Sequence, residues 1–186
     1  MSETNHQIRL AARPSGLPRA TDWSLTTEEV PDPAEGQFVV AVSHVSIDPA
    51  MRGWMNAVRS YVPPVEIGAV MRAGAVGRVT ASAHPGFAVG DDVYGAFGVQ
   101  EYATSDGQGV ITIDTSLAAP STYLGALGTT GLTAYFGLLD TGKLREGDTV
   151  VVSGAAGAVG SVAGQIAKLK GAGSSASRAG RRSAGC

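Results

Sequence analysis

Short apolar stretches separated by glycine turns occupy the first 120 residues of the chain. The clearest covers residues 36–47, GQFVVAVSHVSI, which are rich in β-branched side chains and are bounded by glycine and proline turns. Weaker stretches of the same kind lie at residues 6–12, 74–82, 93–97 and 99–104. Short strands at close spacing with glycine turns are typical of a small barrel-like β domain. We therefore expect a β domain over residues 1–120.

The spacing of apolar residues becomes helical near Pro120. Residues 122–127 and 130–139 follow a helical period, and one stripe carries Leu132, Tyr135, Phe136 and Leu139. The run Asp148–Ser153, DTVVVS, is continuous and apolar, as in a buried parallel strand. Residues 158–170 are helical again, and the positions expected to face inward are Val159, Val162, Ala163, Ile166 and Leu169. Strand, glycine turn and helix in this order predict the start of a Rossmann domain over residues 121–172.

The last segment, residues 173–186, has no aromatic side chain, no large aliphatic side chain and no period. This composition predicts a disordered tail rather than the second strand of a Rossmann sheet. We hypothesise that the tail is a shifted reading frame and that the Rossmann domain is truncated. Bases that encode residues 173–185, read one base earlier, can give Arg-Val-Val-Gly-Ile-Ala-Gly-Gly-Pro-Glu-Lys-Cys-Gly, a strand followed by a loop. Sequencing the gene tests the hypothesis, which fails if no long downstream frame continues the domain.

The turn Ser153–Gly160 carries the strongest chemical signal, because its three glycines stand three residues apart. In a nucleotide-binding turn, the first glycine permits a tight bend and the second lets the backbone approach a pyrophosphate. The third allows the helix to pack closely on the strand. The N–H groups that open the helix then face the anion. We predict that a dinucleotide cofactor is bound by Gly154, Ala155, Ala156, Gly157, Ala158, Val159 and Gly160. The alternative is a glycine-rich loop with no ligand, and the flanking strand and helix argue against it.

A second polar segment follows the strand at 36–47. Asp48 is expected to cap a short helix whose first position is Pro49. Arg52, on the same helix, faces either an anionic cofactor phosphate or solvent, and both interpretations stay open.

A third segment places Thr133 and Tyr135 on an otherwise apolar helix. Either side chain could hydrogen-bond a carboxamide or an enolate oxygen, so both are candidate catalytic residues. The alternative is that both are satisfied polar groups of the core, an interpretation that is stronger for Tyr135 than for Thr133.

Composition and charge exclude several classes of protein. Apolar residues make up 44% of the chain and the net charge is −2, which gives no basis for a nucleic-acid or anionic-membrane partner. The N-terminus lacks the apolar core of a signal peptide, and the apolar runs are too short to span a bilayer. Cys186 is the single cysteine, which excludes an internal disulfide and fits a cytoplasmic protein. The histidines have no metal-ligand spacing, so we expect no zinc; they are His6, His44 and His84.

Taken in order, three segments resemble the medium-chain dehydrogenase/reductase family. They are residues 46–55 (SIDPAMRGWM), 127–138 (LGTTGLTAYFGL) and 150–160 (VVVSGAAGAVG). The resemblance is greatest to the zinc-independent branch that contains the leukotriene B4 12-hydroxydehydrogenase/prostaglandin reductases and the bacterial curcumin reductases. Zinc-using relatives carry a catalytic cysteine where this chain has Asp48, and Gly-His-Glu where it has Gly68-Ala69-Val70. Both departures agree with a metal-free site.

The resemblance implies an α/β protein with a GroES-like N-terminal β-barrel domain, followed by the first βα unit of a Rossmann fold. It also implies an NADP(H)-dependent oxidoreductase that reduces the C=C bond of α,β-unsaturated ketones and aldehydes, usually as a homodimer. Hydride goes to the β-carbon, hydrogen-bond donors hold the enolate, and a proton reaches the α-carbon.

Two alternatives remain. An NADPH:quinone oxidoreductase would use the same cofactor, and the segment at Asp48-Pro49 argues against it. A non-catalytic truncated remnant is the other, because a Rossmann sheet with one strand and one helix leaves apolar faces uncovered.

Overall fold

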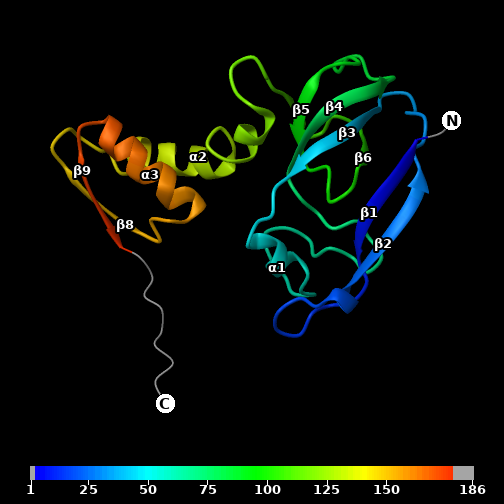
Figure 1. Ribbon diagram of the computed structural model, residues 1–186, viewed down its shortest axis with the longest axis horizontal. Helices are drawn as coiled ribbons and strands as arrows, with labels where there is room; N and C mark the ends of the chain where they lie inside the picture. Colours follow the sequence, from blue (N-terminus) through cyan, green and yellow to red (C-terminus); the bar gives the residue numbers. More distant parts are fainter. Residues whose placement is uncertain (1–2, 178–186) are drawn as a thin grey trace. The chain divides into compact units, whose positions relative to one another are not determined.

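A computed structural model describes residues 3–177 of the chain. The chain forms two compact units, Met1–Ser121 and Thr122–Cys186 (Figure 1). The first consists mainly of β strands and the second of alternating helices and strands, so the α/β class expected from the sequence is confirmed. No helix within residues 3–177 is long and apolar enough to cross a membrane.

Antiparallel strands build the first unit. A two-stranded sheet pairs β1 (Thr4–Leu10) with β2 (Trp23–Glu29). A five-stranded sheet has the order β6-β3-β4-β5-β7, with β3 (Phe38–Val45), β4 (Ala75–Ser82), β5 (Asp92–Gly95), β6 (Tyr102–Ser105) and β7 (Ile111–Thr112). The sequence pattern did not predict β2 and β7. The sequence of β2, WSLTTEE, is mostly polar, and β7 has only two residues, so main-chain pairing rather than apolar alternation makes them strands.

The core of the first unit comes from alternate positions on its strands. Phe38 and Val40 stand two residues apart on β3 and therefore point to the same face, where they pack with Val79 and Val93. All four are at most 1% exposed. A second cluster joins the hairpin formed by β1 and β2 to the segment after β3. Its buried members are Leu10, Met55, Val65 and Met71. The first unit thus has two small packed centres.

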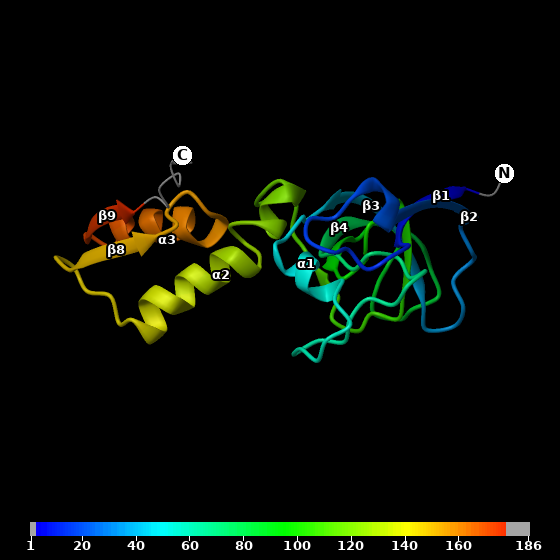
Figure 2. The same ribbon diagram turned by 90° about the horizontal axis from the view of Figure 1, so that it is seen from below.

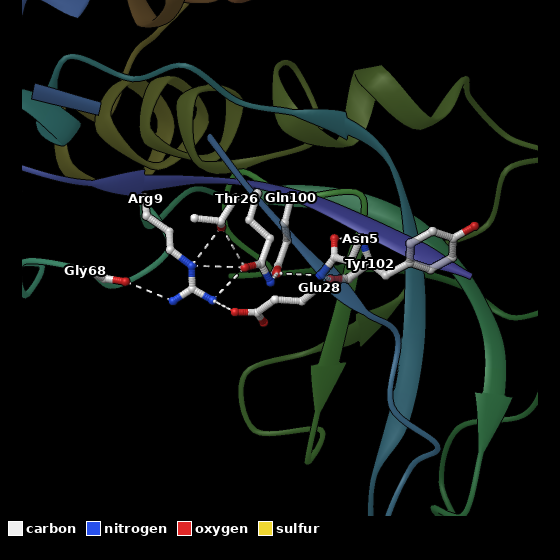
Figure 3. A network of polar contacts seen from close by, with 8 residues as sticks. Asn5, Arg9, Thr26, Glu28, Gly68, Gln100 and Tyr102 are labelled. Atoms are coloured by element: carbon white, nitrogen blue, oxygen red, sulfur yellow. Dashed lines mark hydrogen bonds and ion pairs between the residues drawn. The ribbon is translucent and has the colours of Figure 1, made fainter. Parts of the chain in front are cut away.

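A network of polar side chains ties β1 to the segment that leads into β6 (Figure 3). The side chains of Asn5 and Gln7 lie inside the unit, since each residue is 5% exposed. Both donate from their amide nitrogens to Gln100 Oε1, at 3.2 Å and 3.0 Å. The Gln7 Oε1 oxygen accepts from Arg9 Nε and Nη2 at 3.0 Å and 2.6 Å. Polar partners rather than apolar packing therefore fix this part of the hairpin.

Short helices connect the strands of the first unit. The 3₁₀ helix η1 (Ala20–Asp22) leads into β2, and α1 (Ala50–Trp54) follows β3. The expected helix after Asp48 is therefore present, but its N-cap is Pro49 and no side chain caps it. The Asp48 carboxylate instead accepts a hydrogen bond from the Ser46 hydroxyl at 2.7 Å. The prediction that Asp48 caps this helix is wrong, because its side chain turns back to its neighbour.

The second unit contains helices and a parallel strand pair. The 3₁₀ helix η2 (Pro120–Leu124) leads to α2 (Thr129–Tyr135), which continues as the π-helix η3 (Phe136–Thr141). β8 (Thr149–Ser153) and β9 (Gly173–Ser177) pair in parallel, joined through α3 (Ala158–Leu169). Figure 2 shows α2 and α3 side by side, and α3 also packs against both strands.

The strand β9 corrects the prediction that residues 173–186 form a disordered tail. Gly173 pairs with Thr149, and the register continues to Ser177 opposite Ser153. The composition misled because strand pairing is made by backbone N–H and C=O groups, which every non-proline residue carries whatever its side chain. Residues 178–186 lie outside the described part of the chain, so the rest of the prediction and the reading-frame hypothesis stay untested.

The apolar stripe predicted on residues 130–139 is not buried. Leu132, Tyr135 and Phe136 are 51%, 50% and 54% exposed, whereas Gly131 and Ala134 are the buried residues of α2. A π turn follows, in which the Gly142 N–H donates to the Gly137 carbonyl at 2.9 Å. Because a π turn bonds residues five apart, the α-helical period no longer applies from Phe136 onward, whereas Leu132 and Tyr135 lie before it, on α2. Leu169, expected to face inward from α3, is 84% exposed.

Asp92 gives the first unit a pH-dependent contribution to stability. Its carboxylate accepts from Arg78 Nε and Nη2 at 2.8 Å and 2.9 Å, and from the Thr115 hydroxyl at 2.7 Å. The hydrogen bond from Arg78 is the main cause that holds the pKa of Asp92 below its usual value, and desolvation opposes it. A lowered folded-state pKa stabilises above the unfolded-state pKa, and that stabilisation is lost as the pH falls through the folded-state value.

We expect Asp92→Asn to lower the free energy of unfolding by about 1 kcal/mol at neutral pH, because the Arg78 side chain is 63% exposed and solvent screens the pair. At an acidic pH below the folded-state pKa of Asp92, the wild type and the variant should differ much less. Urea denaturation followed by circular dichroism measures both values. An equal loss at the two pH values would show that the charge of Asp92 contributes nothing.

Candidate functional site

The turn between β8 and α3 owes its shape to its glycines. Gly154 has a φ of +63°, in the left-handed region that disfavours side chains. Gly157 is the N-cap of α3, and its N–H donates to the Gly154 carbonyl at 2.8 Å. A Cβ added to Gly160 would lie 2.5 Å from the Gly154 carbonyl oxygen and 3.0 Å from Ala155 Cα. The first and third glycines are thus required by a positive φ and by a close approach, while the second begins the helix.

The first turn of α3 presents free backbone donors. The bond from the Ser161 N–H to the Gly157 carbonyl, at 2.9 Å, closes this turn. The N–H groups of Ala158, Val159 and Gly160 come before it, where an α-helix offers no carbonyl one turn back. Among the described residues no side chain caps this end. Together with the positive end of the helix dipole, these donors can hold an anion such as a pyrophosphate.

The residue that reads the adenosine ribose in a Rossmann fold follows the second strand. β9 is in the position of that strand and ends at Ser177. The residues that follow are outside the described part of the chain, so a ribose or 2′-phosphate contact stays a prediction.

Arg52 is held by its own unit. Its Nε and Nη2 donate to the carbonyls of Gly16 and Pro14 at 2.9 Å and 3.1 Å, and Nη1 donates to Asn56 Oδ1 at 2.7 Å. The side chain therefore fastens the loop before η1 to helix α1. A contact from Arg52 to a cofactor phosphate stays a prediction.

Thr133 and Tyr135 differ in what their hydroxyls do. The Thr133 hydroxyl donates to the Thr129 carbonyl one turn earlier at 2.6 Å, so its proton is already used within the helix. The Tyr135 ring meets the Phe136 ring edge to face, with 5.4 Å between the ring centres, and Tyr135 is 50% exposed. Of the two candidate catalytic residues, Tyr135 has the more available hydroxyl. The interpretation of Tyr135 as a buried core group does not agree with this exposure.

The residues described contain no group of three or more His, Cys, Asp or Glu side chains that could hold a metal ion. The three histidines have separate local partners. His6 Nδ1 lies 2.6 Å from Glu101 Oε2, His44 Nδ1 lies 3.1 Å from Ser43 Oγ, and His84 Nδ1 accepts from the Gly86 N–H at 2.9 Å. A zinc-independent site stays a prediction.

Sequence reasoning missed the pair Trp54 and Arg72, which the fold brings together. The Arg72 guanidinium lies over the Trp54 ring, 5.5 Å from its centre. No sequence signal could have found the pair, because helix α1 and the segment before β4 meet only in the folded unit.

The comparisons with known proteins agree with the fold. The family model for the N-terminal domain of oxidoreductases matches residues 6–113. The chain is 48% identical over 172 residues to a Bacillus subtilis protein named as an NADP-dependent oxidoreductase, covering 92% of this chain and 50% of that protein. It is 45% identical over 169 residues to the NADPH-dependent curcumin reductase of Escherichia coli, covering 91% of this chain and 49% of the reductase. The chain thus spans about half the length of the curated relatives it matches.

A solved structure is also similar. CurA from Vibrio vulnificus superposes with a TM-score of 0.85 at 46% identity, covering 95% of this chain and 52% of CurA. The same protein in complex with NADPH gives a TM-score of 0.85 at 45% identity and the same coverage. The N-terminal domain and the strand–turn–helix that follows it are therefore each built as in the corresponding part of CurA.

Proposed function

We propose, from the premise that the chain belongs to the medium-chain dehydrogenase/reductase family of oxidoreductases, that it binds NADP(H) at the turn Ser153–Gly160. We further propose that the whole protein reduces the C=C bond of α,β-unsaturated ketones or aldehydes. The turn carries the proposal, because Gly154 has a positive φ and a Cβ at Gly160 would meet the Gly154 carbonyl, so both glycines let the turn run close to the start of α3. The relatives named above are NADP-dependent.

NADPH, when bound, supplies the hydride. The described residues would bind the cofactor and offer a hydrogen-bond donor to the substrate. The N–H groups of Ala158, Val159 and Gly160 would hold the pyrophosphate without a charged side chain, as the helix dipole allows. Of the two candidate donors to the oxygen of the developing enolate, Tyr135 has the more available hydroxyl, because the Thr133 hydroxyl is already bonded within α2. We therefore favour Tyr135 over Thr133 as the catalytic candidate.

Cofactor choice is tested by thermal unfolding of the chain with each nicotinamide cofactor. NADPH at about 100 times its Kd should stabilise the folded state by about 2.7 kcal/mol, whereas NADH at the same concentration should stabilise it less. Oxidation of NADPH on adding an enone then tests the reaction. A shift with NADH and none with NADPH would refute the cofactor assignment, and oxidation by a quinone but not by an enone would move the chain to the quinone reductases.

A second candidate is a chain that does not turn substrate over. Apolar side chains of the second unit are exposed, including Val151 at 73% and Leu169 at 84%. Such surfaces favour self-association over a stable catalytic unit. NADPH binding without turnover of any enone would support this candidate.

Four further expectations are kept as part of the proposal. They are a small-molecule enone as substrate, a homodimer, a cytoplasmic location and independence from zinc. The names of the relatives support the first, since curcumin reductase acts on a small molecule.

A further inference from the structure

Trp54 carries a donor that the fold leaves unsatisfied. Its ring packs against the buried cluster of Leu10, Met55, Val65 and Met71. The indole Nε1 is buried and has no hydrogen-bond partner among the described residues. Buried polar groups in native proteins are nearly always paired, because an unpaired one loses its bonds to water without replacement. A donor in this state needs an acceptor that the described residues do not provide.

Arg72 lies over the Trp54 ring and also has hydrogen-bonding capacity to spare. Its guanidinium is 5.5 Å from the centre of the Trp54 ring. In the described part of the chain it makes one hydrogen bond, from Nη1 to the Pro63 carbonyl at 2.9 Å, and no ion pair. A guanidinium has five N–H donors in a rigid fork, so most of them remain available. Among the described residues, a positive charge without a carboxylate partner therefore lies over the ring that carries the unpaired N–H.

We propose that Trp54 and Arg72 form a binding site for a carboxylate. Both groups are donors only, so the occupant must accept from both. A carboxylate offers two oxygens with about four lone-pair positions, and it also neutralises the arginine, which a ketone or an alcohol does not. Local hydrogen bonds anchor both residues, since the Trp54 carbonyl accepts from the Val65 N–H at 2.8 Å and the Pro63 carbonyl holds Arg72.

The proposal concerns the first unit and does not depend on cofactor binding or on turnover. If the proposed reduction is correct, the site would favour enones that carry a carboxylate. The experiment therefore uses binding alone, without NADPH, so that a failure of this site and a failure of the proposed function are seen separately.

Two probes that differ by one group test the site. They are 4-phenylbut-3-en-2-one and the same enone with a carboxylate on its ring. The chain contains two tryptophans, so a Trp23→Phe background leaves Trp54 as the only tryptophan reporter. We expect the carboxylate probe to change Trp54 fluorescence and to bind at least about tenfold more tightly than the neutral probe, as a charge-assisted hydrogen bond permits.

Variants then assign the effect to the pair. Arg72→Gln should reduce the preference for the carboxylate probe to less than about threefold, and Arg72→Lys should restore part of it. Trp54→Phe keeps a ring and removes the N–H, and thermal shifts with the two probes should show the same loss of preference. Circular dichroism confirms that each variant is folded.

The matched control is Arg59→Gln, which removes an exposed arginine of the loop after α1. This variant should keep the full preference. Equal binding of the two probes by the wild type, an unchanged preference in Trp54→Phe, or an equal loss in Arg59→Gln would each overturn the site. The last result would mean that the probe responds to the general positive charge of this region.

Discussion

Gly160→Ala is expected to weaken NADPH binding at least about tenfold. The added Cβ would lie 2.5 Å from the Gly154 carbonyl oxygen, far inside van der Waals contact, and 3.0 Å from Ala155 Cα. Both neighbours are backbone, so the turn must shift and carry the donors of α3 away from the pyrophosphate. Overpacking of this kind costs about 1–3 kcal/mol. Isothermal titration of the variant with NADPH measures the effect.

Gly164→Ala is the matched control, because it makes the same change one turn later on the same helix. A Cβ at Gly164 meets nothing within 4 Å. This variant should bind NADPH as the wild type does and gain up to about 1 kcal/mol of stability from the better helix former. Full NADPH affinity in Gly160→Ala would contradict the assignment of the turn, and equal losses in both variants would point to a general weakening of α3.

Asn5→Ala is expected to lower the free energy of unfolding of the first unit by about 3 kcal/mol, the largest effect on stability. The Asn5 Nδ2 donates to Gln100 Oε1 at 3.2 Å and to the Tyr102 carbonyl at 2.8 Å (Figure 3). Its Oδ1 accepts from the N–H groups of Glu101 and Tyr102 at 3.1 Å and 2.9 Å. Alanine removes all four of these hydrogen bonds, and each buried group left unpaired costs about 1–3 kcal/mol. Urea denaturation followed by circular dichroism provides the measurement.

The neighbouring residue supplies the control. The His6 ring pairs with Glu101 at 2.6 Å, and the two side chains are 51% and 55% exposed. Exposed pairs contribute little because solvent screens them, so His6→Ala should cost less than about 1 kcal/mol. A loss in Asn5→Ala no larger than that in His6→Ala would show that the buried network does not hold the hairpin.

The sequence was sufficient wherever the deciding interactions are local. The turn Ser153–Gly160 could be predicted because its glycines, the strand before it and the helix after it all lie within about twenty residues. The strand at 36–47 was found for the same reason, since its apolar alternation reports the face it buries. The order of these local signals was also sufficient to indicate the family.

Only the tertiary structure decided what depends on distant partners. Arg52 donates to the carbonyls of Gly16 and Pro14, which are 36 and 38 residues away, and nothing in its own segment announces them. The strand β9 contains only small residues, so its pairing with β8 rests on backbone groups that the sequence pattern does not display.

The same reason accounts for Trp54. In the sequence, Trp54 is one apolar residue among many. Only the fold buries its N–H and places Arg72 over its ring. The spacing of three glycines is enough to predict the turn, because a positive φ and a close backbone approach are properties of the local backbone. The burial of a donor and the charge beside it are properties of the whole unit, and the sequence by itself does not determine where they meet.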